Sequence, residues 1–85
     1  MDRYCSAIHP RVLARNPGLP PVSDRAGFVF HCGCSLEPLT LDEIREAVLG
    51  YDRTFPDTAE ADGWPLITVE KLLKELCEAG WMRKV

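Results

Sequence analysis

The strongest hydrophobic pattern lies near the end of the sequence. Its apolar positions recur every three or four residues, which places them on one face of a helix: Val69, Leu72, Leu73, Leu76 and Cys77. Thr68 suits the N-cap, because a threonine hydroxyl accepts a hydrogen bond from an unpaired amide at a helix start. Gly80 suits a left-handed C-cap, with Trp81 folding back on Leu76. We therefore predict a helix over 68–79 and a short extended segment over 81–85.

A second helix is indicated by its start signal. Thr40 and Glu43 have the spacing of a capping box, in which each side chain accepts a hydrogen bond from the other residue's amide. Gly50 is placed where a helix commonly ends. The pattern therefore predicts a helix over 40–50, and its buried face is expected to hold Leu41, Ile44 and Val48.

The run GFVFHC alternates in the manner of a strand. Alternation places Phe28, Phe30 and Cys32 on one face, and Val29 and His31 on the other. We predict a strand over 27–32 that turns at Gly33 and pairs with 81–85.

Residues 1–26 are predicted to form an irregular arm, because four prolines interrupt any long helix. A short helical piece is expected over 9–14. The arm is also the most basic part of the chain, with Arg3, Arg11, Arg15 and Arg25. It is either a solvated arm or a basic arm that contacts an acidic partner or a phosphate backbone.

Residues 51–66 form a long connection, with one helical turn expected within 57–62. Two sets of side chains make it a candidate protein-binding surface. The aromatic set also serves to anchor the connection to the core, and consists of Tyr51, Phe55 and Trp64. The acidic set forms the tip of the connection, and consists of Asp57, Glu60 and Asp62.

The length of 85 residues fits a single domain over 1–85, of class α+β. So short a chain buries a modest core and gains from a metal, a disulfide or a partner. It shows no signal-peptide pattern and no apolar run long enough to span a bilayer. We therefore expect a cytoplasmic protein in a reducing compartment, where cysteines more often bind metal than pair with one another.

Four side chains are candidate ligands of a structural zinc ion that would hold the arm against the predicted strand: Cys5, His9, Cys32 and Cys34. The ligands come as Cys-x3-His, which suits a helical turn, and Cys-x-Cys, which suits a tight turn. Four protein ligands leave no position open for substrate. Ordinary reduced thiols are the alternative, and His31 as a replacement ligand, an iron–sulfur centre or a disulfide remain open. Cys77 is interpreted as a small buried hydrophobic residue.

The stretches LTLDEIREAVLG and ITVEKLLKELCEAGWMRKV resemble winged helix-turn-helix domains, above all the DNA-binding half of the ferric-uptake-regulator-like family. In that family a helix opening Leu-Ser/Thr-x-x-Glu-Ile precedes a recognition helix that begins Thr-Val and ends Leu-x-x-Ala-Gly-hydrophobic. The matching positions are 39–47, Thr68, Val69 and 76–81. The resemblance implies a winged-helix-like part over 39–85, although the 51–66 connection is long for that motif and the residues after Trp81 are too few for a two-stranded wing.

No P-loop, GxSxG, HExxH or dinucleotide-binding motif is present, so we expect no enzyme activity.

The formal net charge of −3 does not favour electrostatic binding of nucleic acid over a broad surface. The first hypothesis is therefore a non-catalytic protein-interaction module. In size and charge it resembles phage- or mobile-element-encoded inhibitors of nucleic-acid-handling complexes, including anti-CRISPR proteins.

The second hypothesis is a small DNA-binding transcriptional regulator. The winged-helix resemblance implies that the helix over 68–79 would enter the major groove. The basic residues available for DNA contact are Lys71, Lys74, Arg83 and Lys84. Glu70, Glu75 and Glu78 lie on the same helix and would face the polyanion.

Overall fold

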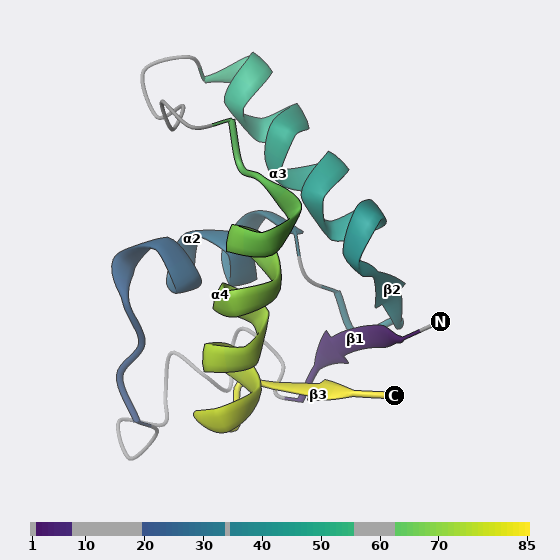
Figure 1. Cartoon of the computed structure of the whole chain (residues 1–85), viewed down its shortest axis with the longest axis vertical. Coiled ribbons are helices and arrows are strands. Elements are labelled where there is room, and N and C mark those ends of the chain that lie inside the picture. Colours follow the sequence, from purple (N-terminus) through teal and green to yellow (C-terminus); the bar gives the residue numbers. More distant parts are fainter. Residues whose placement is uncertain (1, 8–19, 34, 56–62) are drawn as a thin grey trace.

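The computed structural model describes residues 2–7, 20–33, 35–55 and 63–85, which form a small α+β domain. Three helices pack on one another, and a small antiparallel sheet lies to one side of them (Figure 1). The elements in chain order are β1 (Arg3–Ser6), α2 (Asp24–Gly33), β2 (Leu39–Thr40), α3 (Leu41–Thr54), α4 (Leu66–Glu78) and β3 (Met82–Lys84). Among the described residues, no helix is long and apolar enough to cross a membrane.

The strand β1 lies at the centre of the sheet, between β2 and β3. It pairs antiparallel with both neighbours, so that Tyr4 lies opposite Leu39 on one side and Lys84 on the other. The prediction of an irregular arm over 1–26 is therefore wrong for its first residues. Hydrogen bonding on both edges makes a strand of a segment whose sequence carries few strand signals, since pairing and burial override weak propensity.

The strand predicted over 27–32 is a helix, α2. Its buried residues follow the spacing i, i+3, i+4, i+7 and are Ala26, Val29, Phe30 and Gly33. The backbone amide of Ala26 donates to the hydroxyl of Ser23 at 3.2 Å, which stabilises the helix start. The apolar residues within 28–32 are compatible with either a strand or a turn of helix, because the run is short. Here the segment is helical and packs against α3 and α4. The segment 81–85 consequently pairs with β1 and not with 27–32.

The capping box of α3 is confirmed. The Glu43 amide donates to Thr40 Oγ1 at 3.2 Å, and the Thr40 amide donates to Glu43 Oε1 at 2.9 Å. Ile44 and Val48 are buried as expected. Gly50 does not end the helix, which continues to Thr54. A glycine inside a helix costs only about 1 kcal/mol, and the turn beyond it contributes buried contacts.

The helix α4 buries Val69, Leu73 and Leu76, as the apolar pattern predicts. It begins two residues before Thr68, with Pro65 at the N-cap, so the predicted threonine cap is wrong. The predicted C-cap is confirmed: Gly80 has φ of +82°. The Trp81 amide donates to the Leu76 carbonyl at 3.0 Å, and the Gly80 amide donates to the Cys77 carbonyl at 3.1 Å. These two bonds are those of a Schellman motif.

Trp64 fixes the end of the long connection to the core. Its side chain is 1% exposed, and its indole Nε1 donates to Asp52 Oδ2 at 2.6 Å. The ring stacks on Phe28 with centroids 5.5 Å apart, and the Arg25 guanidinium lies 4.7 Å from its centre. The expected core anchor is thus confirmed for Trp64, whereas the expectation that this ring lies on an exposed surface is wrong. The predicted helical turn within 57–62 lies outside the described residues.

Gly33 permits the close approach of α2 and α3, and its replacement by alanine tests that contact. A Cβ at this position would lie 2.9 Å from Ile44 Cγ2 and 3.0 Å from the Ile44 carbonyl oxygen. We expect Gly33→Ala to destabilise the fold by about 1–3 kcal/mol, measured by urea unfolding. Gly27→Ala on the same helix is the control, because the nearest atom would lie 4.0 Å away. It should be neutral or stabilising, and equal losses in both variants would contradict the close approach.

The capping box also predicts a pH dependence. The hydrogen bond from the Thr40 amide, with a smaller contribution from the Thr40 side chain, lowers the pKa of Glu43. A carboxyl pKa lowered by folding contributes stability above its unfolded value, and this stability is lost as the pH falls through the folded value. We expect Glu43→Gln to show a smaller loss of thermal stability on acidification than the wild type. Glu46→Gln, which alters the same helix outside the cap, should keep the wild-type slope, and identical slopes in all three proteins would contradict the prediction.

Candidate functional site

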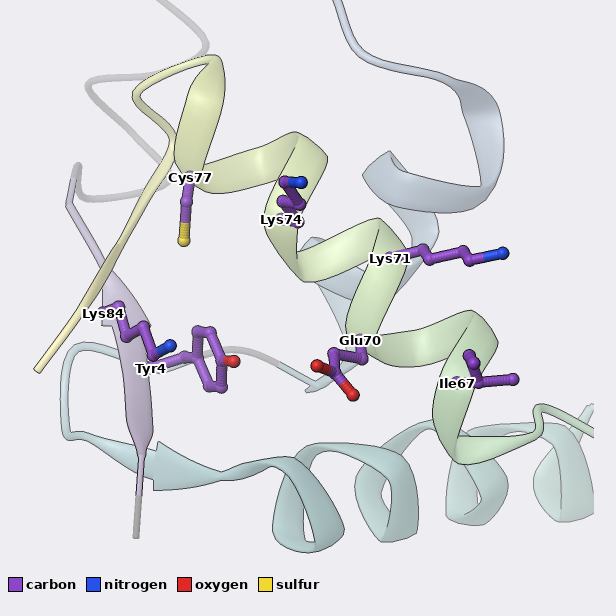
Figure 2. Close-up of a pocket in the computed structure, with 7 residues that line it drawn as sticks. All are labelled: Tyr4, Ile67, Glu70, Lys71, Lys74, Cys77 and Lys84. Atoms are coloured by element: carbon purple, nitrogen blue, oxygen red, sulfur yellow. The ribbon is translucent and has the colours of Figure 1, made fainter.

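A groove lies between α4 and the strands β1 and β3. It has a volume of about 400 Å³. Figure 2 shows Tyr4 and Lys84 reaching from the two strands toward the helix. The groove is lined by Tyr4, Ile67, Glu70, Lys71, Lys74, Cys77 and Lys84.

Helix periodicity explains why residues spaced along α4 line the same groove. Five of the lining residues belong to α4 and follow the spacing i, i+3, i+4, i+7, i+10, which defines one helix face. Val69, Leu73 and Leu76 lie on the face that packs into the core. The turn after Gly80 then returns the chain along β1, where the sheet register places Lys84 opposite Tyr4. One helix thus supplies both core residues and groove residues.

The floor of the groove carries no charge at neutral pH. Tyr4 is 8% exposed, and burial raises the pKa of its hydroxyl, with Lys84 acting in the opposite direction. Burial likewise raises the pKa of the Cys77 thiol, and Lys84 again opposes the shift. Both groups are therefore protonated at neutral pH. Ile67 extends this apolar surface outward with 65% of its side chain exposed.

Charges of both signs surround this floor. The Lys84 ammonium lies 2.9 Å from Asp2 Oδ2, and this hydrogen bond raises the pKa of Lys84. Lys71 and Lys74 are exposed and form no ion pair with any other described residue. Glu70 lies on the same helix face and offsets part of their charge. The rim is thus basic at the Lys71 and Lys74 side, but it is not uniformly basic.

A second groove of about 290 Å³ adjoins the first and shares Tyr4 and Glu70 with it. Its remaining lining consists of Asp2 just before β1, the N-cap residue Thr40 at the end of β2, and Leu41 and Asp42 in the first turn of α3. Asp2 and Asp42 are both exposed carboxylates. The second groove is therefore the acidic counterpart of the first.

The structure brings together three of the four basic residues considered for DNA contact. Lys71, Lys74 and Lys84 line one groove, whereas Arg83 does not line it. The Nε of Arg83 donates to Cys5 Sγ at 3.2 Å, and successive residues of a strand point to opposite faces. Tyr4 is not among the predicted site residues, because its place in the groove depends on β1, a strand for which the sequence carries few signals.

The protein-binding residues predicted in the 51–66 connection are only partly described. Trp64 is buried. Tyr51 is half-buried, and Phe55 is 50% exposed with its ring 4.8 Å from that of Tyr51. The acidic residues Asp57, Glu60 and Asp62 lie outside the described ranges. The acidic tip therefore stays a prediction.

Two of the four predicted zinc ligands are described. Cys5 lies fully buried in β1, in a strand and not in the expected helical turn, and Cys32 lies half-buried in the last turn of α2. His9 and Cys34 lie outside the described ranges. Within those ranges, no three Cys, His, Asp or Glu side chains are grouped as a metal site would require. The structure thus leaves the four-ligand zinc site a prediction of the sequence.

Comparisons of this chain with protein-family models, with curated proteins and with solved structures give no match.

The zinc hypothesis predicts one zinc ion per chain in protein purified without chelators. Removal of the metal should then lower the thermal unfolding midpoint, since metal binding contributes to folding free energy. Elemental analysis and thermal melts with and without chelator test both statements. Cys77→Ser, outside the predicted ligand set, should retain the metal, whereas Cys32→Ser should lose it. A folded wild-type protein without zinc would contradict the hypothesis.

Proposed function

We propose that this protein is a non-catalytic protein-interaction module on a winged-helix scaffold, and that the groove between α4 and the sheet is its contact surface. The observation that carries the proposal is the combination of an uncharged floor at Tyr4 and Cys77 with exposed Ile67 and a rim of both charge signs. Protein interfaces combine an apolar centre with a polar rim in this way. A polyanion would instead favour a rim of one sign.

The order of elements supports the choice of scaffold. Helix α2, strand β2, helices α3 and α4, and strand β3 follow one another as the helices and first two strands of a winged-helix domain do. In that fold a third strand returns after the second one. Here β1, from the beginning of the sequence, pairs with both β2 and β3 and so occupies the place of the returning strand. The proposed scaffold is therefore a winged helix whose sheet is completed from the other end of the chain.

The size and net charge of the domain support a basic protein surface as its partner. The domain has 85 residues and a formal net charge of −3, which suits association with a basic protein surface. Basic surfaces are typical of complexes that handle nucleic acid. We therefore keep an inhibitor of such a complex, comparable to anti-CRISPR proteins in size and charge, as the proposed biological role. Cytoplasmic localisation is part of the same proposal.

One observation favours a second function, a DNA-binding regulator. Lys71, Lys74 and Lys84 lie around one groove beside the helix that would enter the major groove. Against it, Asp2 neutralises Lys84, and Glu70 would face the phosphates. Two lysines without an ion-pair partner in the described part of the chain provide a small electrostatic footprint compared with the several phosphate contacts of typical DNA-binding domains.

A DNA titration separates the two functions. We expect no saturable binding of random duplex DNA at a low salt concentration of about 50 mM, where phosphate contacts are strongest. Fluorescence anisotropy measures this directly. Micromolar binding that weakens steeply with added salt, and that is lost in Lys71→Glu/Lys74→Glu but kept in Arg53→Glu, would establish the regulator and overturn the protein-interaction module. Arg53 is an exposed arginine that lines neither groove.

A photo-crosslinking residue placed at position 67 tests the module itself. Ile67 is exposed and lines the groove, so the substitution leaves the core intact. In cells that produce the protein, we expect a discrete protein adduct from position 67 and none from position 53. Adducts of equal yield at both positions, or adducts at neither, would contradict the proposed contact surface.

A further inference from the structure

We propose that the two grooves act as one cleft with opposite charges at its ends, and that the cleft binds a peptide segment with the complementary order of charges. The segment has an acidic side chain where it meets Lys71 and Lys74, an apolar side chain over Tyr4, and a basic side chain where it meets Asp42. This inference rests on the proposed function, since it specifies the partner chemistry of the same surface.

The two grooves adjoin at two shared residues. Tyr4 and Glu70 line both of them, so a segment that lies across these two side chains contacts the basic groove on one side and the acidic groove on the other. Figure 2 shows the Tyr4 ring and the Glu70 carboxylate pointing toward one another from β1 and α4. The shared pair therefore forms the middle of a single cleft, with a volume of about 400 Å³ on one side of it and about 290 Å³ on the other.

The charges of the cleft are separated along its length. Lys71 and Lys74 line only the first groove, and Asp42 lines only the second. Lys84 and Asp2, one from each groove, bind one another at 2.9 Å and cancel. The remaining charges are positive at Lys71 and Lys74 and negative at Asp42, with the Glu70 carboxylate between them. A partner with the opposite order of charges satisfies both ends, whereas a uniformly acidic chain is repelled at Asp42.

In the middle of the cleft, an apolar side chain can pack on the edge of the Tyr4 ring, beside the Glu70 carboxylate. Tyr4 is 8% exposed, and Leu41 in the second groove is half-buried. Toward the other end, Ile67 remains 65% exposed and Cys77 is protonated. Covering these groups removes apolar surface from water, which supplies affinity, while the charged ends set the orientation of the segment.

A displayed library of random peptides of about a dozen residues, long enough to contact both ends of an interface of this kind, identifies the preferred sequences. We expect the selected peptides to carry acidic and basic side chains at opposite ends of an apolar centre. Synthetic versions are then titrated by calorimetry against the wild type, Lys71→Gln/Lys74→Gln and Asp42→Asn. Arg53→Gln and Glu46→Gln are the matched controls, since these residues form an exposed pair outside both grooves.

The expected effects are a loss of about tenfold in affinity for the double lysine variant and of about threefold for Asp42→Asn, with no change in the controls. Exchanging the acidic and basic residues of the peptide should weaken binding to the wild type by at least about tenfold. In the double lysine variant, that exchange should weaken binding less. This non-additivity is the mark of a direct pairing.

The remaining outcomes separate the inference from the function on which it rests. Peptides that lose binding in Ile67→Lys, but show no ordered charges or ignore Asp42→Asn, would overturn the inference and leave the groove as a protein-binding surface. A library that yields no binder would also overturn the inference, and the crosslink from position 67 would still decide the proposed function. Peptides that bind equally to Ile67→Lys and the wild type, or steeply salt-dependent DNA binding in place of peptide binding, would overturn both.

Discussion

The hydrogen bonding of β1 on both edges is the constraint on which the rest of the structure depends. Its Arg3 carbonyl accepts from the Val85 amide at 2.7 Å, and the Trp81 carbonyl accepts from the Ala7 amide at 2.9 Å. On the other edge, β1 pairs with the two-residue strand that leads into the capping box of α3. One short strand therefore fixes where α3 begins and where the chain goes after α4. It also places Tyr4 in the middle of the cleft.

The helix α4 divides its side chains between stability and recognition. Val69, Leu73 and Leu76 fill the core, and the neighbouring face carries Glu70, Lys71 and Lys74 around the groove. Because the two faces share one backbone, any packing change that rotates the helix would also move the lysines relative to Tyr4. The stacking of Trp64 on Phe28 and its hydrogen bond to Asp52 fix the chain just before the helix. The position of the recognition face is thus set by buried contacts.

The parts of the fold that follow from local chemistry could be predicted from the sequence. The capping box at Thr40 and Glu43 and the left-handed Gly80 depend only on residues close in sequence, and both are confirmed. The parts that depend on distant partners could not be predicted. The short alternation within α2 fits two periodicities, and β1 becomes a strand only through residues 39–40 and 82–84. The helix pattern predicts that Lys71 and Lys74 are exposed on one helix. The position of Tyr4 in the groove depends on the pairing of β1, which the sequence does not predict.

The sequence separation of the strand partners has a consequence for the order of folding. Tyr4 pairs with Lys84, so the small sheet joins residues from opposite ends of the described sequence. Closing so long a loop costs entropy that local helix formation does not, and such contacts form late in most small domains. During synthesis the helices α2, α3 and α4 precede β3, so Tyr4 lacks its partner on that edge until residues 82–84 have left the ribosome. The first groove, which needs both Tyr4 and Lys84, is therefore completed after these helices can form.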